Sequence, residues 1–272
     1  MSAPLRRLCA LAAAALLLAG CVTQSQTTTP PSPSNETRDR ITASDEPEAQ
    51  KRARTRMELA SAYFGRGQMT TALDQVKLAL VADPLYGDAF NLRGLIYANL
   101  GEPTLAEESF RRALQLNARD ADAMHNYGWF LCQQKRYPES TALFGQALAV
   151  PQYRGESRTL LTRGVCQAFA GQLAESEASL TRAYQLDPGN PFIVTNLSEV
   201  LYQRGEFERA RFYIRRVNAM PEVSSAQTLW LAARIENRLG NRQGAGELGI
   251  QLRNRFPDSP EAGLFSRGAF DE

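Results

Sequence analysis

The sequence is poor in the residues and motifs that enzymes use. Among its 272 residues there is a single histidine, His125, and no cysteines are spaced with it as metal ligands. The sequence contains no P-loop, no dinucleotide-binding glycine pattern and no Gly-x-Ser-x-Gly elbow. Adjacent carboxylates such as Glu107 and Glu108 are expected on a solvated helix face. We therefore predict a protein that is not an enzyme and that uses no cofactor, metal or small-molecule substrate.

The N-terminal segment has the pattern of a secretory signal. Arg6 and Arg7 precede an apolar stretch from Leu8 to Ala19. This stretch is shorter than the roughly 20 apolar residues that a membrane-spanning helix needs. The pattern predicts that residues 1–20 are a signal peptide that is removed from the mature protein.

The end of this segment, Leu18-Ala19-Gly20-Cys21, resembles the lipobox of bacterial lipoproteins, which signal peptidase II cuts before the cysteine. In that class the cysteine carries a diacylglycerol and an N-acyl chain. An ordinary signal followed by a chance cysteine is the alternative. Aspartate after the cysteine usually retains such proteins in the inner membrane, and here the residue is Val22. The resemblance implies that Cys21 is lipidated and anchors the protein at the periplasmic face of the outer membrane.

A strong net charge is also missing. Without residues 1–20, which hold two arginines and no acidic residue, the chain has 29 basic and 29 acidic residues. We find no basic run that could follow a phosphate backbone, so we expect no nucleic-acid partner. Residues 22–50 are rich in Thr, Ser, Pro and charge and bury too little apolar surface to fold. We predict a lipidated, disordered tether at residues 21–52, with a role as a docking peptide as the alternative.

A period of 34 residues begins at Ala53. Tyr63 and Gly67 of the first unit recur as Tyr97 and Gly101 of the second. The pattern resembles the tetratricopeptide repeat (TPR), in which small residues let two antiparallel helices approach closely. It predicts an all-α fold, an α-solenoid with a concave inner surface and a C-terminal cap at residues 260–272. Its six helix-turn-helix repeats are expected at residues 53–86, 87–120, 121–154, 157–190, 191–224 and 226–259.

The resemblance to tetratricopeptide repeats also implies which residues line the concave groove. These are the second, fifth, ninth, twelfth and thirteenth residues of each unit. The apolar group Met57, Phe64 and Leu95 is the favoured place for an extended or helical partner segment. Packing between neighbouring first helices is the alternative for several groove positions. The candidate groove residues are Met57, Phe64, Asn91, Leu95, Asn99 and Trp129, with His125, Leu161, Val165 and Phe169 as further lining positions.

Two cysteines, Cys132 and Cys166, fall in the first helices of the third and fourth units. First helices of successive repeats pack side by side, which can bring the two residues within bridging range. The periplasm is oxidising, so we predict a disulfide between them. Two buried free thiols are the alternative.

The segment from Asn126 to Cys132 is not required by a generic repeat. Together with Pro151, Tyr153 and the segment from Arg255 to Glu261, it resembles the type IV pilus biogenesis and stability lipoproteins called PilF or PilW. This resemblance implies a pilotin, a lipoprotein that binds the pilus secretin subunit and promotes its localisation or multimerisation in the outer membrane. The alternatives are a TPR scaffold for β-barrel insertion and a regulatory subunit of a peptidoglycan synthase.

Overall fold

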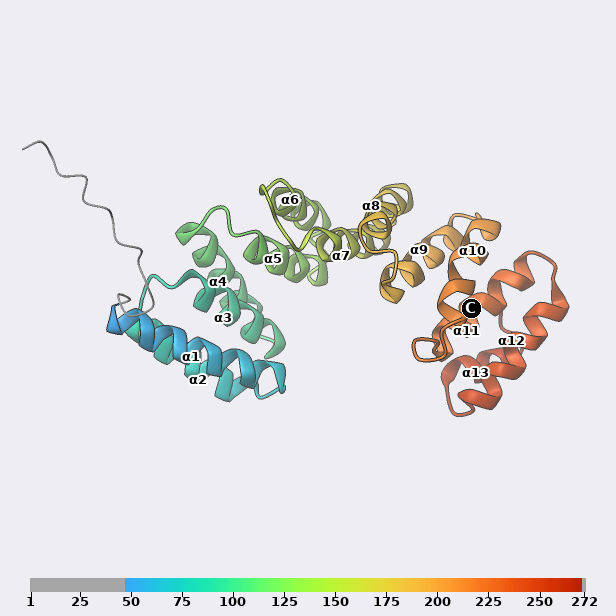
Figure 1. Cartoon of the computed structure of the whole chain (residues 1–272), viewed down its shortest axis with the longest axis horizontal. Helices are drawn as coiled ribbons and strands as arrows, with labels where there is room; N and C mark the ends of the chain where they lie inside the picture. The colour runs from blue at the N-terminus through green and yellow to red at the C-terminus, as the bar shows by residue number, and fades with distance from the viewer. Residues whose placement is uncertain (1–46, 271–272) are drawn as a thin grey trace, which may run out of the picture. The chain divides into compact units, whose positions relative to one another are not determined.

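The computed structural model describes residues 47–270, which form thirteen α-helices and no strand (Figure 1). This confirms the predicted all-α solenoid. The expected signal peptide, Cys21 and the tether up to residue 46 lie outside the described residues. The helices are α1 (Glu48–Gly65), α2 (Met69–Ala82), α3 (Gly87–Asn99), α4 (Pro103–Leu116), α5 (Ala121–Gln133), α6 (Tyr137–Leu148), α7 (Glu156–Phe169), α8 (Leu173–Leu186), α9 (Pro191–Gln203), α10 (Phe207–Asn218), α11 (Ala226–Arg238), α12 (Arg242–Arg255) and α13 (Pro260–Ser266).

Within each repeat, a small residue on the first helix lets the second helix approach closely. A Cβ atom added to Gly94 of α3 would lie 2.7 Å from the ring of Phe110 on α4. Hydrogen bonds also cross the same contact in α5 and α6, where the Ser140 hydroxyl donates to the carbonyl of Gly128 over 2.7 Å. In the α9–α10 pair the serine is on the first helix instead, and Ser198 donates to the carbonyl of Ala210 over 2.9 Å. Close packing and satisfied buried hydroxyls therefore hold each helix pair together.

Successive repeats contact each other through their first helices, which approach one another more closely than the second helices do. The first helices α1, α3, α5, α7 and α9 each contact the first helix of the next repeat, and the last of these contacts is with α11. Within residues 47–270, the second helices of successive repeats do not approach each other in this way. The first helices therefore form one continuous face of the stack, which we call the first-helix face.

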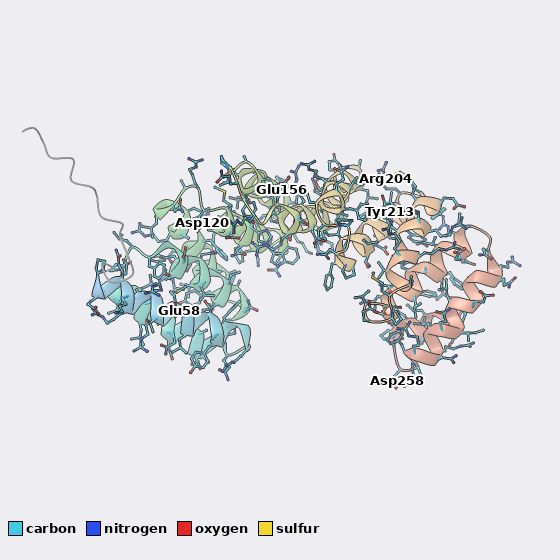
Figure 2. The ribbon with its side chains drawn as sticks, viewed as in Figure 1. Glu58, Asp120, Glu156, Arg204, Tyr213 and Asp258 are labelled. Atoms are coloured by element: carbon cyan, nitrogen blue, oxygen red, sulfur yellow. A yellow bond between two sulfur atoms is a disulfide. The ribbon has the colours of Figure 1, made fainter. Side chains whose placement is uncertain are left out.

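Partly buried carboxylates link second helices to the next repeat. Glu107 of α4 accepts hydrogen bonds from the hydroxyl of Tyr127 on α5 over 2.8 Å and from Arg136 over 2.9 Å. Two repeats later, Glu177 of α8 pairs with Arg209 over 2.7 Å and with Arg204, which Figure 2 labels. Both glutamates lie at the same position of their repeats, so this ionic contact recurs along the stack.

The C-terminal helix covers the end of the last repeat. The ring of Phe265 in α13 meets Trp230 of α11 edge-on, with centroids 6.5 Å apart, and Phe270 stacks on the same indole at 5.2 Å. Gly249 of α12 lies directly against Phe265, where a Cβ atom would come within 1.8 Å of the ring. These aromatic contacts bury Trp230 to 5 % exposure.

The structure corrects the expected end of the tether at residue 52. Helix α1 begins at Glu48, so the last residues of that segment belong to the first repeat. Glu48, Ala49 and Gln50 are good helix formers, and the Glu48 carboxylate lies in the first turn, where the helix dipole favours negative charge. Pro47 precedes the helix, and its carbonyl accepts from the backbone nitrogen of Lys51 over 3.0 Å.

Candidate partner-binding surface

Two hollows lie on the first-helix face. The first has a volume of about 420 Å³ and is formed mainly by α1 and α3. It brings together three of the predicted groove residues, Met57, Asn91 and Leu95. Met57 is only 7 % exposed and packs in the core between these helices, and Phe64 and Leu95 pack partly buried against the same core. Little of the apolar surface of this predicted group is therefore open to a partner.

The polar residues predicted for this part of the groove have partners within the protein. Asn91 accepts a hydrogen bond from the side-chain amide of Asn126 over 3.1 Å, which links α3 to α5. Asn99 donates to the carbonyl of Leu95, one turn earlier in the same helix, over 2.8 Å. Asn99 and Phe64 do not line the hollow. The two asparagines thus contribute to the repeat structure.

The second hollow, of about 360 Å³, is formed by three consecutive first helices, α5, α7 and α9. It contains the predicted groove residue Trp129 and three of the four further predicted lining positions, His125, Leu161 and Val165. Phe192 of α9 also lines it and is 71 % exposed. The fourth predicted lining position, Phe169, lies at the end of α7 and is 64 % exposed but does not line this hollow. The lining residues are His125, Trp129, Arg158, Leu161, Thr162, Val165, Phe192 and Asn196. The second hollow therefore offers more open aromatic surface than the first.

The base of the second hollow is uncharged at neutral pH. His125 is buried, and its Nδ1 lies 2.9 Å from the hydroxyl of Thr159, which also lies 2.9 Å from the Tyr153 hydroxyl. Burial, assisted by the charge of Arg158 and opposed by Asp122, lowers the pKa of His125 to about 4. Arg158 is ion-paired with Asp122 at the rim. An apolar side chain of a partner would thus contact uncharged residues at the bottom of the hollow and charged residues at its edge.

Cys132 and Cys166 belong to a buried cluster against which Trp129 of this hollow packs. Their sulfur atoms are bonded, and their Cα atoms are 5.9 Å apart. The disulfide joins α5 to α7, two of the three helices that form the second hollow. Trp129 packs against the buried cluster that contains both cysteines and Phe144. The position of Trp129 therefore depends on the contact that the disulfide holds.

Phe192 was absent from the residues that the sequence singled out. It is the second residue of the fifth unit, so the same positional rule that selected the other groove residues would have found it.

No group of three or more His, Cys, Asp or Glu side chains within residues 47–270 is arranged to hold a metal ion. In that same part of the chain, no helix has the length and apolar character needed to cross a membrane.

Comparisons with known proteins agree with the repeat architecture. Tetratricopeptide-repeat models match residues 57–123, 91–157 and 170–229. The chain is 28 % identical over 205 residues to the type IV pilus assembly protein PilF of Pseudomonas aeruginosa, covering 75 % of this chain and 81 % of PilF.

Two solved structures are similar over nearly their whole length. One is PilW, described as a widely conserved type IV pilus biogenesis factor, with 34 % identity, a TM-score of 0.73, and coverage of 78 % of this chain and 97 % of PilW. The other is Pseudomonas aeruginosa PilF, with 26 % identity, a TM-score of 0.72, and coverage of 81 % and 99 %. The chain belongs to the family of tetratricopeptide-repeat proteins of type IV pilus biogenesis that includes PilF and PilW.

Proposed function

We propose that the protein is a pilotin, an outer-membrane lipoprotein that binds the type IV pilus secretin and promotes its localisation and multimerisation. The observation that carries the proposal is the 34 % identity to PilW across 97 % of that protein. The repeat fold is typical of protein-interaction scaffolds, which supports a role in binding. In this proposal the protein is not an enzyme, because binding and release of a secretin segment require no chemical step.

In this proposal the lipid anchor localises the protein and the repeats bind the secretin. Each buried acyl methylene contributes about 0.8 kcal/mol, so several chains on Cys21 would hold the protein firmly at the periplasmic face of the outer membrane. Anchoring raises the effective concentration of the binding surface where the secretin ring assembles. The hollow of α5, α7 and α9 would receive apolar side chains of a secretin segment, with Trp129 and Phe192 as its aromatic walls.

The proposal is tested by following the heat-stable secretin multimer in fractionated membranes. Three strains are compared: a deletion, the deletion complemented with the wild-type gene, and the deletion complemented with Cys21→Ala. We expect the multimer to be lost or misplaced in the deletion and Cys21→Ala strains, together with surface pili, and to be restored by the wild type. An unchanged outer-membrane multimer in the deletion strain would contradict the pilotin role.

Co-purification separates the pilotin from the other envelope scaffolds. Tagged protein extracted from membranes should bring down the secretin. Recovery of the β-barrel assembly machinery or of a peptidoglycan synthase, without secretin, would assign the protein to one of those assemblies. The matched control is the same protein with Phe192→Ser, which should recover less of the authentic partner because the substitution removes an exposed aromatic wall of the hollow.

A further inference from the structure

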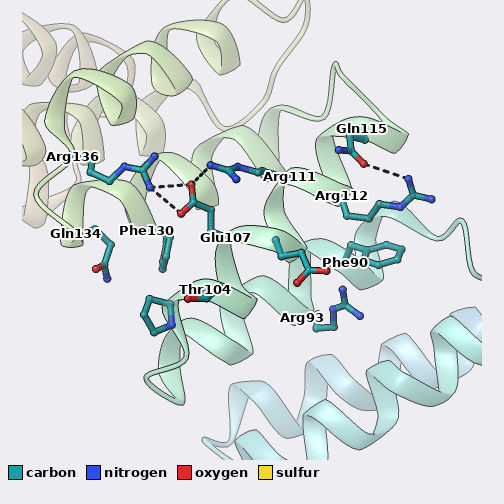
Figure 3. Close-up of a pocket in the computed structure, with 12 residues that line it drawn as sticks. Phe90, Arg93, Thr104, Glu107, Arg111, Arg112, Gln115, Phe130, Gln134 and Arg136 are labelled. Atoms are coloured by element: carbon teal, nitrogen blue, oxygen red, sulfur yellow. Dashed lines mark hydrogen bonds and ion pairs between the residues drawn. The ribbon is translucent and has the colours of Figure 1, made fainter.

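A larger cleft lies along α4, formed by other residues than the two hollows. Its volume is about 810 Å³, and Figure 3 shows the side chains that line it. Phe90 and Arg93 come from α3, a continuous face of α4 from Thr104 to Gln115 forms the length of the cleft, and Phe130 comes from α5. The proposed secretin-binding hollow shares no residue with this cleft.

At one end of the cleft two arginines, Arg111 and Arg136, are balanced by two carboxylates, Glu107 and Glu139, the second of which pairs with Arg136 over 2.5 Å. Glu107 accepts from Arg111 over 2.6 Å and from Arg136 over 2.9 Å, as the dashed lines in Figure 3 mark. Burial alone would raise the pKa of Glu107, but hydrogen bonds from Tyr127 and Arg136 and the charges of both arginines together lower it. Glu107 therefore stays ionised, and together with Glu139 it neutralises this end.

At the other end, two guanidinium groups share one aromatic ring. The guanidinium carbon of Arg93 lies 4.7 Å from the centroid of Phe90, and that of Arg112 lies 5.8 Å from the same centroid. Arg93 donates through Nε to the buried hydroxyl of Ser109 over 3.0 Å. Arg112 donates through Nη1 to the side-chain carbonyl of Gln115 over 3.3 Å. These hydrogen bonds go to neutral acceptors, so they orient the two guanidinium groups without neutralising them.

We propose that this cleft binds an acidic segment of a partner protein, with a carboxylate held by Arg93 and Arg112. The planar guanidinium offers paired N–H groups that match a carboxylate, and its contact with Phe90 limits its motion. The face of α4 from Thr104 to Gln115 extends about 16 Å, which is room for about five residues of extended peptide. Phe90 and Phe130 line the same cleft but are only 9 % and 3 % exposed, so the arginines rather than apolar contacts carry the binding.

The two glutamates of the cleft favour such a peptide over a continuous polyanion. Glu107 and Glu108 both line the cleft together with the arginines. A phosphate-rich membrane surface or a nucleic acid would place further negative charge against them. A peptide can place its carboxylates at the Arg93 and Arg112 end and neutral side chains beside Glu107. The cleft would thus give the protein a second partner contact that does not depend on the pilotin role.

Fluorescence anisotropy with the full lipidated chain in detergent tests the proposal. The probe is a fluorescein-labelled decapeptide in which glutamate alternates with leucine, and its matched control has glutamine in place of glutamate. We expect saturable binding of the acidic peptide only, weakened by added NaCl. In the Arg93→Gln/Arg112→Gln variant the Kd should rise about 10-fold or more. Arg182→Gln, which removes an exposed arginine of α8, is the control and should bind as the wild type does.

Several outcomes would overturn the proposal. Equal binding of the acidic and glutamine peptides, unchanged binding in the double variant, or no binding to the wild type would each do so. Displacement of the peptide by inorganic phosphate or by vesicles containing phosphatidylglycerol, at lower concentration than by unlabelled acidic peptide, would assign the cleft to a phosphate group instead. Arg112→Gln alone guards against misfolding, because the hydrogen bond of Arg112 goes to exposed Gln115 and its contact with Phe90 is the longer of the two cation–π contacts. Circular dichroism checks the helicity of this variant. Arg112→Lys keeps the charge without the planar fork and should bind between the wild type and Arg112→Gln.

Discussion

The Cα atoms of Cys132 and Cys166 lie 5.9 Å apart, although one full repeat length of 34 residues separates them. They are the twelfth and tenth residues of their units, because two residues, Gly155 and Glu156, are inserted between the third and fourth units. The disulfide therefore crosses between non-equivalent positions of α5 and α7. It also fixes two of the helices that form the second hollow on the first-helix face.

Removal of this disulfide should lower the thermal stability of the repeats. A loop of this length predicts a loss of about 3–4 kcal/mol if the bond acts mainly by restricting the unfolded chain. We expect the Cys132→Ser/Cys166→Ser variant to melt at a lower temperature than the oxidised wild type, and reduction to bring the wild type to the value of the variant. Thermal unfolding followed by circular dichroism, with and without reductant, measures this. If maleimide labels both thiols in the unfolded, non-reduced wild type, the cysteines are unpaired.

Gly94 and Gly145 make a matched pair for testing helix packing. A Cβ atom at Gly94 would lie 2.7 Å from the Phe110 ring, whereas nothing lies within 4 Å of a Cβ atom at Gly145 in α6. Gly94→Ala should therefore destabilise the protein by about 1–2 kcal/mol, because crowding outweighs the better helix propensity of alanine. Gly145→Ala should stabilise it by up to about 1 kcal/mol. Urea unfolding of both variants measures these free energies, and equal effects of the two substitutions would contradict the packing argument.

The sequence period predicts the helix pairs because their geometry requires small residues at fixed positions. Gly94, Gly128 and Gly164 each lie against a large side chain of the second helix, so their spacing alone identifies the repeat. The period also identifies which residues face the first-helix side. It does not predict their exposure, because this depends on the neighbours: Met57 is buried by packing between α1 and α3, whereas Phe192 stands open on α9.

The cleft along α4 is a different case. Arg93 and Arg112 belong to two helices, and only the packing of α3 against α4 places both guanidinium groups around Phe90. A run of basic residues would have been visible in the sequence, but here the charges are separated along the chain and interleaved with Glu107 and Glu108. Such a site depends on tertiary contacts, and sequence patterns do not reveal it.

His125 should make the protein less stable in mild acid. Its pKa is about 4 in the folded protein, against a usual value of 6.5, because burial disfavours the charged ring. The unfolded chain therefore takes up a proton at this residue below about pH 6.5, whereas the folded protein does so only below about pH 4. This difference costs nothing at pH 7 and about 2 kcal/mol of folding free energy at pH 5.

The variant His125→Gln separates this effect from the titration of other groups. Glutamine does not titrate and can still bond to Thr159 beside it. Urea unfolding at pH 7 and pH 5 should show a larger loss of stability for the wild type than for the variant. If both proteins lose the same free energy between these pH values, His125 is protonated in the folded state and its pKa is not depressed.

The two hollows of the first-helix face predict different effects on partner binding. If the second hollow binds the partner, Phe192→Ser should weaken recovery of purified secretin about 10-fold or more, because an exposed aromatic side chain would lose its buried contacts in the complex. Phe212→Ser is the matched control, since Phe212 is 57 % exposed but lies on the second helix α10. Phe64→Ser with Leu95→Ser tests the predicted apolar group of α1 and α3, of which Leu95 lines the first hollow, in the same pull-down.

The outcome decides between the two surfaces without relying on stability. Phe192 and Phe212 are both largely exposed, so neither serine variant should unfold the protein, and any difference in binding reflects position on the stack. Phe64 and Leu95 pack against the core of the first two repeats, so binding by their variant must be compared at equal helicity. Full binding by Phe192→Ser, combined with loss of binding by a folded Phe64→Ser/Leu95→Ser variant, would move the partner site to α1 and α3. The opposite result would place it at α5, α7 and α9, where the Cys132–Cys166 disulfide holds two of the helices together.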